Sequence, residues 1–318
     1  MTAPTTLGPT RELFLTADAP NGSVEYVWRL PSSKPPRGLV LLAHGCRQSP
    51  RVWFERSTGC PECIPRPEER CLSERLSRAG YALLAAGNMK GSKGCWETND
   101  VPVVSAMLRS WRRRHEKSVP KRLPLFLLGP SSGGFLATQA ARQWGGGVVR
   151  GLSIQVSVPS ADDVRAPGFP KHLQVVLLQK DAGKLKEAEA LRRAMPTAEV
   201  LVQPPVAVPP HFFSDAMPGL APAKSAAVRD ALVAAGHIDG RTSMVRTHPS
   251  RGTWRDAVRA ALEGGGSGRH AESLQQGSLQ LTMDGIFARL DLAYGYHAST
   301  CEVANKTLAF FERLAPDV

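Results

Sequence analysis

A short segment rich in glycine and serine, residues 129–133, has the composition of a turn that presents a nucleophile. Its sequence, Gly-Pro-Ser-Ser-Gly, fits the pattern G-x-S-x-G, with Ser131 at the centre and a glycine two residues away on each side. Small residues are needed there because so tight a turn brings the backbone close to its neighbours. Since the chain has 29 glycines in 318 residues, this match is weak by itself and depends on its surroundings.

The residues on either side of this segment predict a buried strand followed by a helix. Residues 125–128 are apolar without alternation, as in a parallel strand covered on both faces, and residues 135–142 have a helical composition. The free N–H groups at the start of the helix would lie where negative charge develops on a bound carbonyl oxygen. The expected chemistry is attack by the Ser131 hydroxyl on a carbonyl carbon.

Apolar strands and helices alternate along most of the chain and predict an α/β fold with a mostly parallel central sheet flanked by helices. A turn cluster between two short runs predicts an antiparallel hairpin over 12–30, at one edge of the sheet. The other predicted strands are 38–45, 81–86, 125–128, 148–157, 172–181 and 198–203, and the predicted helices are 67–79, 101–116, 135–142 and 184–195.

After residue 203 the pattern changes. Residues 204–223 are apolar and rich in proline, residues 224–290 are largely helical in character, and a glycine-rich linker occupies 264–268. We therefore expect four parts, which are a flexible amino terminus (1–10), an α/β core (11–208), a helical insertion that could form a lid (209–290), and a closing part with a last helix (291–318).

Six cysteines occur, at positions 46, 60, 63, 71, 95 and 301. Cys60 and Cys63 form a C-x-x-C pair, but no second pair follows at zinc-finger spacing. Four of the six fall between Cys60 and Cys95. One or two disulfides that clasp this loop region are possible, and so is a zinc site of Cys60, Cys63, Cys71 and Cys95. Thioredoxin-like redox chemistry is less favoured because the pair lies in a proline-rich loop.

The formal charge of +12 favours contact with anionic surfaces or substrates. Much of it lies in residues 109–117, which we interpret as the outer face of a helix, since no zinc-finger, RNP or helix-turn-helix signature accompanies them. No run of residues is apolar enough for a membrane span, and residues 1–10 do not look like a signal peptide. The cytoplasm is therefore the default compartment.

Taken together, the motifs resemble the α/β-hydrolase superfamily in their order. His44-Gly45 closes a strand, Gly129–Gly133 joins a strand to a helix, Asp181 closes a later strand, and His297 precedes the terminal helix. The closing Tyr296-His297 segment and the cysteine-rich loop also resemble a little-characterised branch of such proteins from plants and algae.

The resemblance implies a serine hydrolase that cleaves a carboxylic ester, or a related acyl bond, in a small-molecule substrate without a cofactor. Ser131 would be the nucleophile, His297 the general base and then acid, and Asp181 would orient the imidazole. The backbone N–H groups of Cys46 and Ser132 would form the oxyanion hole.

The acid has alternatives. Asp162 and Asp163 lie in the loop after the preceding strand, and the alternative role for Asp181 is to cap the helix that follows it. We favour Asp181 as the acid because it lies at the end of a strand. His44 is interpreted as positional, acting through the neighbouring backbone.

The base has one alternative, His211, which lies in a loop of proline and phenylalanine soon after the strand predicted over 198–203. We favour His297 because a lone histidine in such a loop is more often packed than catalytic.

Two other classes of function remain open. The chain could bind a ligand without catalysis, or it could bind nucleic acid or an anionic surface through residues 112–117, in which case binding would weaken steeply with salt. The sequence predicts neither the particular substrate nor the oligomeric state.

Overall fold

The computed structural model describes residues 8–32, 35–91, 94–120, 122–263 and 272–315. Residues 1–7 of the predicted flexible terminus and the predicted linker at 264–268 lie outside the described residues. The chain divides into two compact units. We call them the sheet unit, formed by Met1–Leu177, Ala182–Val202 and Ser299–Val318, and the helical unit, formed by Leu178–Asp181 and Gln203–Ala298.

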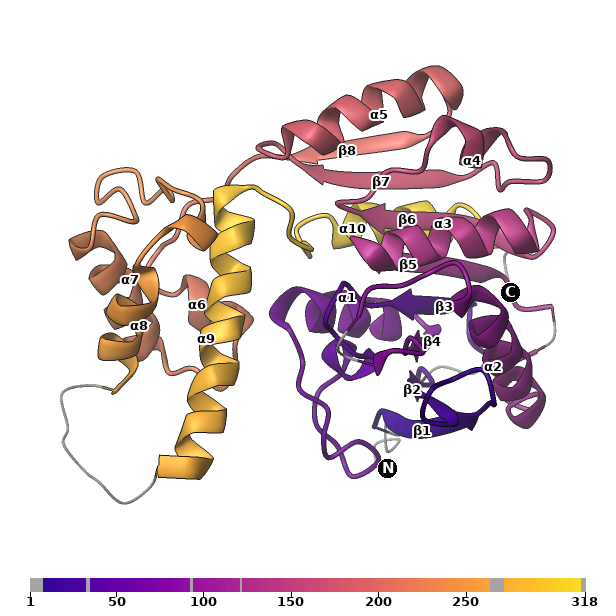
Figure 1. Ribbon diagram of the computed structural model, residues 1–318, viewed down its shortest axis with the longest axis horizontal. Coiled ribbons are helices and arrows are strands. Elements are labelled where there is room, and N and C mark those ends of the chain that lie inside the picture. Colours follow the sequence, from indigo (N-terminus) through magenta and orange to yellow (C-terminus); the bar gives the residue numbers. More distant parts are fainter. Residues whose placement is uncertain (1–7, 33–34, 92–93, 121, 264–271, 316–318) are drawn as a thin grey trace. The chain divides into compact units, whose positions relative to one another are not determined.

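The described residues form an eight-stranded sheet (Figure 1) of β1 (Thr10–Leu15), β2 (Ser23–Arg29), β3 (Gly38–Ala43), β4 (Tyr81–Ala86), β5 (Leu125–Pro130), β6 (Val149–Gln155), β7 (Leu173–Leu178) and β8 (Glu199–Gln203). The strand order is β1-β2-β4-β3-β5-β6-β7-β8. β2 pairs antiparallel with β1 and β4, whereas β3, β4, β5, β6 and β7 pair in parallel with one another. The predicted sheet, with its edge hairpin, is confirmed.

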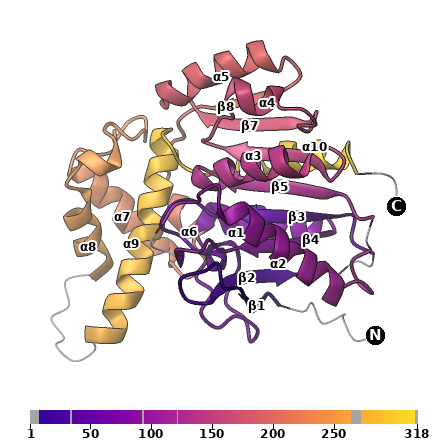
Figure 2. The same ribbon diagram turned by 45° about the vertical axis from the view of Figure 1, so that its right-hand side comes forward.

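Helices cover both faces of this sheet (Figure 2), namely α1 (Pro67–Arg78), α2 (Asp100–Arg114), α3 (Ser132–Trp144), α5 (Ala182–Ala194) and α10 (Ala304–Glu312). In β3, Leu39 and Leu41 belong to a core shared with α2, α3 and α5. Val40 and Leu42 belong to a second core, shared with α1 and α10. Because both faces of the strand are buried, its sequence is apolar without alternation.

The end of β7 differs from its prediction. The strand was expected to reach Asp181 but ends at Leu178. The next N–H groups bond elsewhere, since Lys180 N donates to Gly295 O at 2.9 Å and Asp181 N donates to Leu178 O at 3.0 Å. Asp181 therefore lies in a turn after the strand rather than at its last position.

The helical unit has its own apolar core, formed by residues such as Phe213, Val228, Trp254 and Ile286, which are almost completely buried. Its helices are α6 (Phe212–Ala216), α7 (Pro222–Ala234), the 3-10 helix η3 (Pro249–Arg251), α8 (Trp254–Glu263) and α9 (Glu272–Tyr294). The helical character predicted for residues 224–290 is confirmed within the described part of that range.

The cysteines form three disulfides, Cys46–Cys95, Cys60–Cys63 and Cys71–Cys301. The zinc alternative was therefore wrong, because Cys60, Cys63, Cys71 and Cys95 are divided among all three bonds and present no set of thiolates to one ion. The described residues contain no group of three or more His, Cys, Asp or Glu side chains that could hold a metal. Two disulfides also reach outside the loop that we expected them to clasp.

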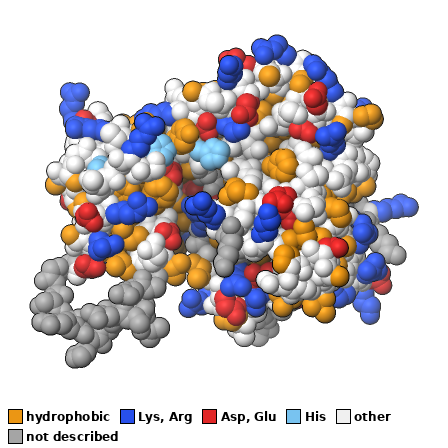
Figure 3. All heavy atoms as spheres, in the orientation of Figure 1, with side chains coloured by type: hydrophobic (Ala, Val, Ile, Leu, Met, Phe, Trp, Pro, Cys, Tyr) orange, Lys and Arg blue, Asp and Glu red, His pale blue; other side chains and the backbone are white. Residues whose placement is uncertain are grey.

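The basic segment 109–117 includes the last turns of α2. The helix buries Met107, Leu108 and Trp111 against the sheet. Arg112 donates to Leu123 O at 3.4 Å, and Arg114 contacts Glu12. Lys and Arg side chains are spread over the face drawn in Figure 3 and are mixed with acidic ones.

Among the helices of the described residues, none combines the length and apolarity that crossing a bilayer requires.

Candidate functional site

Ser131 lies between β5 and α3 with an unusual backbone conformation. Its φ is 52° and its ψ is −118°, a region that non-glycine residues seldom adopt. The conformation is held on both sides, because Ser131 N donates to Gln155 O at 2.8 Å and Phe135 N donates to Ser131 O at 3.2 Å. Strain of this kind persists where surrounding contacts enforce it, and it is common at functional sites.

The two glycines of the motif are required by close backbone approach. A Cβ atom on Gly129 would lie 2.5 Å from the carbonyl carbon of Gly133. A Cβ atom on Gly133 would overlap the carbonyl oxygen of Ala43 and lie 2.8 Å from that of His44. The turn at Ser131 therefore packs directly on the end of β3, and the two glycines meet the need for small residues that the sequence predicted.

The loop after β3 carries the backbone N–H group of Cys46, which was predicted as an oxyanion-hole donor. The Nδ1 atom of His44 lies 2.7 Å from Gly45 O, and Gly45 N donates to the side chain of Gln48 at 3.2 Å. Among the described residues, Cys46 N has no hydrogen-bond acceptor. Because the peptide is planar and trans, fixing the Gly45 carbonyl also fixes the opposite direction of the Cys46 N–H.

His44 is fully buried, and burial lowers its pKa to about 4. The ring is therefore neutral at pH 7, and since a carbonyl only accepts, the Nδ1 atom carries the proton that it donates to Gly45 O. This contact supports the positional role predicted for His44.

In the helical unit, Asp181 and His297 form a side-chain pair. Nδ1 of His297 lies 2.9 Å from Oδ2 of Asp181, and the aspartate is almost completely buried. His297 has a φ of 35°, another rare conformation for a non-glycine residue. The bond from Lys180 N to Gly295 O joins the two loops that carry this pair. A carboxylate at Nδ1 leaves Nε2 as the nitrogen available for proton transfer.

One of the two alternative acids, Asp163, has a structural role. Asp163 accepts from Ser160 in the capping box of α4 (Ala161–Arg165), and Asp162 is exposed in the first turn of that helix.

The alternative base is not paired with Asp181. His211 precedes α6 with an exposed side chain, and its Nε2 lies 3.6 Å from Asp215.

Sequence analysis did not identify Gln155, the last residue of β6. Its side chain accepts from Thr300 N at 2.7 Å and donates to Thr300 O at 3.0 Å, while its own carbonyl accepts from Ser131 N. Only two residues separate His297 from Thr300 in the chain. The signal available in the sequence was a polar residue, Gln155, at the end of a largely apolar strand.

Two buried glutamates in the first turn of α1 hold the same segment. Ser299 Oγ donates to Glu69 at 2.6 Å, and Cys301 N donates to Glu68 at 2.7 Å. Together with the disulfide to Cys71, these contacts fix residues 299–301 in the sheet unit. Adjacent acids at the start of a helix usually indicate favourable placement near its dipole, so the sequence did not predict this role.

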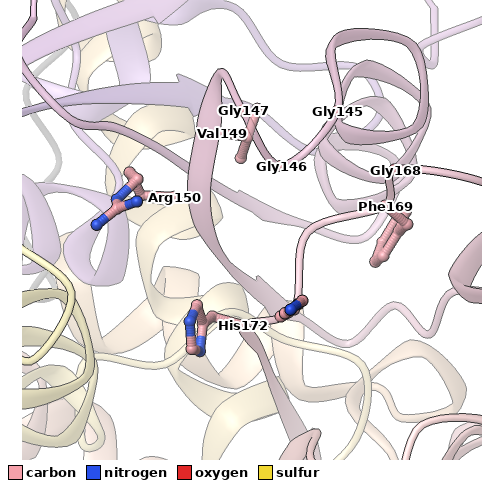
Figure 4. Close-up of a pocket in the computed structure, with 9 residues that line it drawn as sticks. Gly145, Gly146, Gly147, Val149, Arg150, Gly168, Phe169 and His172 are labelled. Carbon is pink, nitrogen blue, oxygen red and sulfur yellow. The ribbon is translucent and has the colours of Figure 1, made fainter.

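A cavity of about 390 Å³ lies elsewhere in the sheet unit (Figure 4). It is lined by residues 145–147, by Val149 and Arg150 at the start of β6, and by Gly168, Phe169, Lys171 and His172 just before β7. It therefore lies at the amino ends of these strands, whereas Ser131 follows the carboxyl end of β5. None of the predicted catalytic residues lines it.

No protein-family model matches the chain, and no curated protein sequence matches it. Several solved structures do. A thermostable esterase aligns with 62% of this chain and 54% of its own length, at 12% identity and a TM-score of 0.44. An esterase from Pyrococcus furiosus aligns with 62% of this chain and 83% of its own, at 13% identity and a TM-score of 0.44. A serine hydrolase homologue from Coxiella burnetii aligns with 66% and 93%, at 18% identity and a TM-score of 0.42.

The architecture itself identifies the fold. A mostly parallel sheet is covered by helices on both faces, and G-x-S-x-G joins a strand to a helix at the carboxyl end of β5. The chain has the α/β-hydrolase fold.

Proposed function

We propose that the protein is a serine hydrolase that cleaves carboxylic esters through Ser131, His297 and Asp181. The observation that carries the proposal is the backbone of Ser131, which is held at a positive φ between β5 and α3. A turn of this kind exposes the serine hydroxyl above the edge of a sheet and brings the N–H groups of the following helix beside it.

The reaction begins when Oγ of Ser131 attacks the ester carbonyl carbon while Nε2 of His297 takes the hydroxyl proton. The negative charge on the carbonyl oxygen is stabilised by the N–H groups of Cys46 and Ser132, and each such donor contributes about 3 kcal/mol. The tetrahedral intermediate collapses, and His297 returns the proton to the departing alcohol. Water then attacks the acyl-enzyme by the same steps and releases the acid, while Asp181 keeps the imidazole in the required tautomer.

The connectivity of the chain supports this grouping. Asp181 is three residues beyond the end of β7, and His297 is three residues before Thr300, whose backbone is bonded to Gln155. Gln155 also accepts from Ser131 N. The segments that carry the base and the acid therefore start from positions tied to the carboxyl edge of the sheet, where α/β proteins bind ligands.

The compartment and the lid are parts of the proposal. Three disulfides favour an oxidising compartment and weigh against the cytoplasm that the sequence suggested. We also propose a lid role for the insertion, residues 209–290, as expected from the sequence.

Hydrolysis of a short p-nitrophenyl ester by purified protein tests the proposal. We expect Ser131→Ala to lower kcat by about 10⁵-fold, because no other group replaces the nucleophile. Ser132→Ala is the matched control and should retain activity within about threefold, since its role is performed by the backbone N–H. Full activity in Ser131→Ala would refute the proposal, and so would an inactive, folded wild-type protein.

A further inference from the structure

The loop that carries Cys46 is held by a second loop of the sheet unit, residues 94–96. Trp96 Nε1 donates to His44 O at 2.8 Å, and the two rings are in contact with centroids 4.9 Å apart. Arg47 N donates to Gly94 O at 3.1 Å. The disulfide Cys46–Cys95 adds a covalent bond between the same two loops.

The second loop is itself firmly anchored. Asn88 donates to Gly94 O at 3.1 Å, and the buried Asp100 accepts from Met89 N at 2.9 Å and from Glu97 N at 2.7 Å. Residues 94–97 are thus attached to the end of β4 and to the start of α2. Through the disulfide, this anchored loop constrains the backbone of Cys46.

The three disulfides differ in their exposure to solvent. Cys60 and Cys63 are completely buried in the core beside α1. Cys301 is buried and Cys71 is half-buried. Cys95, by contrast, is exposed and Cys46 is half-buried. Since exchange requires a thiolate to reach a sulfur atom, Cys46–Cys95 is the disulfide that a soluble reductant would attack first.

Arg47 shows that the loop is under local constraint. It is exposed, and its φ is 60°, in a region that disfavours non-glycine residues. The cross-link on the preceding residue and the bond from Arg47 N to Gly94 O hold this conformation. When the cross-link is lost, the backbone on either side of the Cys46 N–H can relax.

We propose that the Cys46–Cys95 disulfide is a positioning element of the oxyanion hole, so that a dithiol reductant lowers catalysis by releasing the Cys46 N–H. The inference rests on the proposed function and deepens it, because it makes the same site sensitive to redox conditions. Cys46 acts here in two ways, because its N–H faces the oxyanion and its side chain, together with the bond from His44 Nδ1 to Gly45 O, holds the direction of that N–H.

The chemistry is ordinary thiol–disulfide exchange. A thiolate of the dithiol attacks Sγ of Cys95, and Cys46 leaves as a thiolate. The second thiol of the reductant then attacks the mixed disulfide and releases Cys95. The protein disulfide gains two electrons and two protons, and the dithiol loses them as it closes into its own disulfide.

The test uses the full chain and dithiothreitol. After brief treatment, free thiols are alkylated and mapped by mass spectrometry, and kcat and KM for a p-nitrophenyl ester are measured in the same sample. We expect alkylation of Cys46 and Cys95 with a fall in kcat of at least about tenfold, less than the 10²–10³-fold that loss of a donor costs. KM should stay within about twofold, because the substrate's ground state does not need the donor. Alkylation of both cysteines with unchanged kcat would overturn the proposal.

Variants separate positioning from stability. The double variant Cys46→Ser/Cys95→Ser should have the low kcat of the reduced protein and should not respond to dithiothreitol. The matched control, Cys60→Ser/Cys63→Ser, lacks a different disulfide. It should keep the wild-type kcat, and that kcat should still fall on treatment with dithiothreitol. Circular dichroism establishes that each protein is folded at the assay temperature. Equal kcat values for wild type and Cys46→Ser/Cys95→Ser would overturn the proposal.

The two proposals fail in different ways. If the oxidised wild type hydrolyses no ester and Ser131 does not react with a phosphonate, the hydrolase proposal fails and this one fails with it. If the oxidised wild type is active through Ser131 but reduction of Cys46–Cys95 leaves kcat unchanged, only the positioning role is wrong.

Discussion

The two parts of the proposed site are built in different ways. In the sheet unit, the nucleophile and the N–H donors depend on backbone geometry, with Ser131 at a positive φ and glycines where no Cβ atom fits. In the helical unit, the base and the acid are two side chains joined by one hydrogen bond of 2.9 Å. A part made of backbone tolerates most side-chain changes, whereas a part made of two side chains is lost with either of them.

Within the side-chain pair, the larger effect is expected from loss of the base. His297→Ala should lower kcat/KM by about 10⁴-fold or more, because no other group would take the proton of Ser131. His211→Ala is the matched control, and since its ring is exposed beside Asp215 it should retain activity within about twofold. If His211→Ala lost activity while His297→Ala kept it, the base would be wrongly assigned.

Asp181→Asn should come next, with a fall in kcat of about 10⁴-fold, because an amide at this position favours the wrong imidazole tautomer. Asp163→Asn makes the same chemical change in the capping box of α4. It should leave kcat unchanged and cost about 1 kcal/mol of unfolding free energy. Steady-state kinetics and chemical denaturation of both variants measure the two effects, and similar losses of kcat in both would contradict the assignment of the acid.

Local patterns were sufficient to predict the strand, the turn and the helix around Ser131. An apolar run, a G-x-S-x-G turn and a helical segment follow one another within twenty residues, so each supports the others. Contacts between distant residues were not predictable in this way. Gln155 and Thr300 are 145 positions apart, and nothing local in either segment indicates the other.

The pairing of the cysteines was likewise not predictable from local sequence patterns. Six cysteines allow about fifteen pairings, and spacing does not choose among them. Four of the cysteines fall within residues 60–95, which made a shared zinc site reasonable, but in the fold Cys95 and Cys71 pair with Cys46 and Cys301, which lie outside that segment. Asp181 was correctly located near the end of a strand, although the strand itself ends three residues earlier.

A smaller effect is expected on folding stability, which should depend on pH through the buried His44 beside the Cys46 loop. Folded His44 stays neutral until its pKa of about 4, while in the unfolded chain it takes up a proton as the pH falls through about 6.5. The unfolded state therefore binds more protons between these values, and stability falls by roughly 3 kcal/mol as the pH is lowered from 6.5 to 4. Above pH 6.5 this contribution to stability is fully present.

His44→Asn isolates that contribution, because an asparagine amide can donate to Gly45 O in place of Nδ1 but does not titrate. Chemical denaturation of both proteins at about pH 4.5 and about pH 7 should show the smaller loss of stability in the variant. Equal losses would mean that His44 is not buried in its neutral form.

Chemical labelling of the nucleophile tests the assignment of Ser131 most directly. Wild-type protein is treated with a fluorophosphonate and digested, and the modified peptide is sequenced by mass spectrometry. We expect one adduct, on Ser131, which forms far more slowly in His297→Ala and is absent from Ser131→Ala. A folded protein that takes up no phosphonate, or takes it up at a residue other than Ser131, would contradict the assignment.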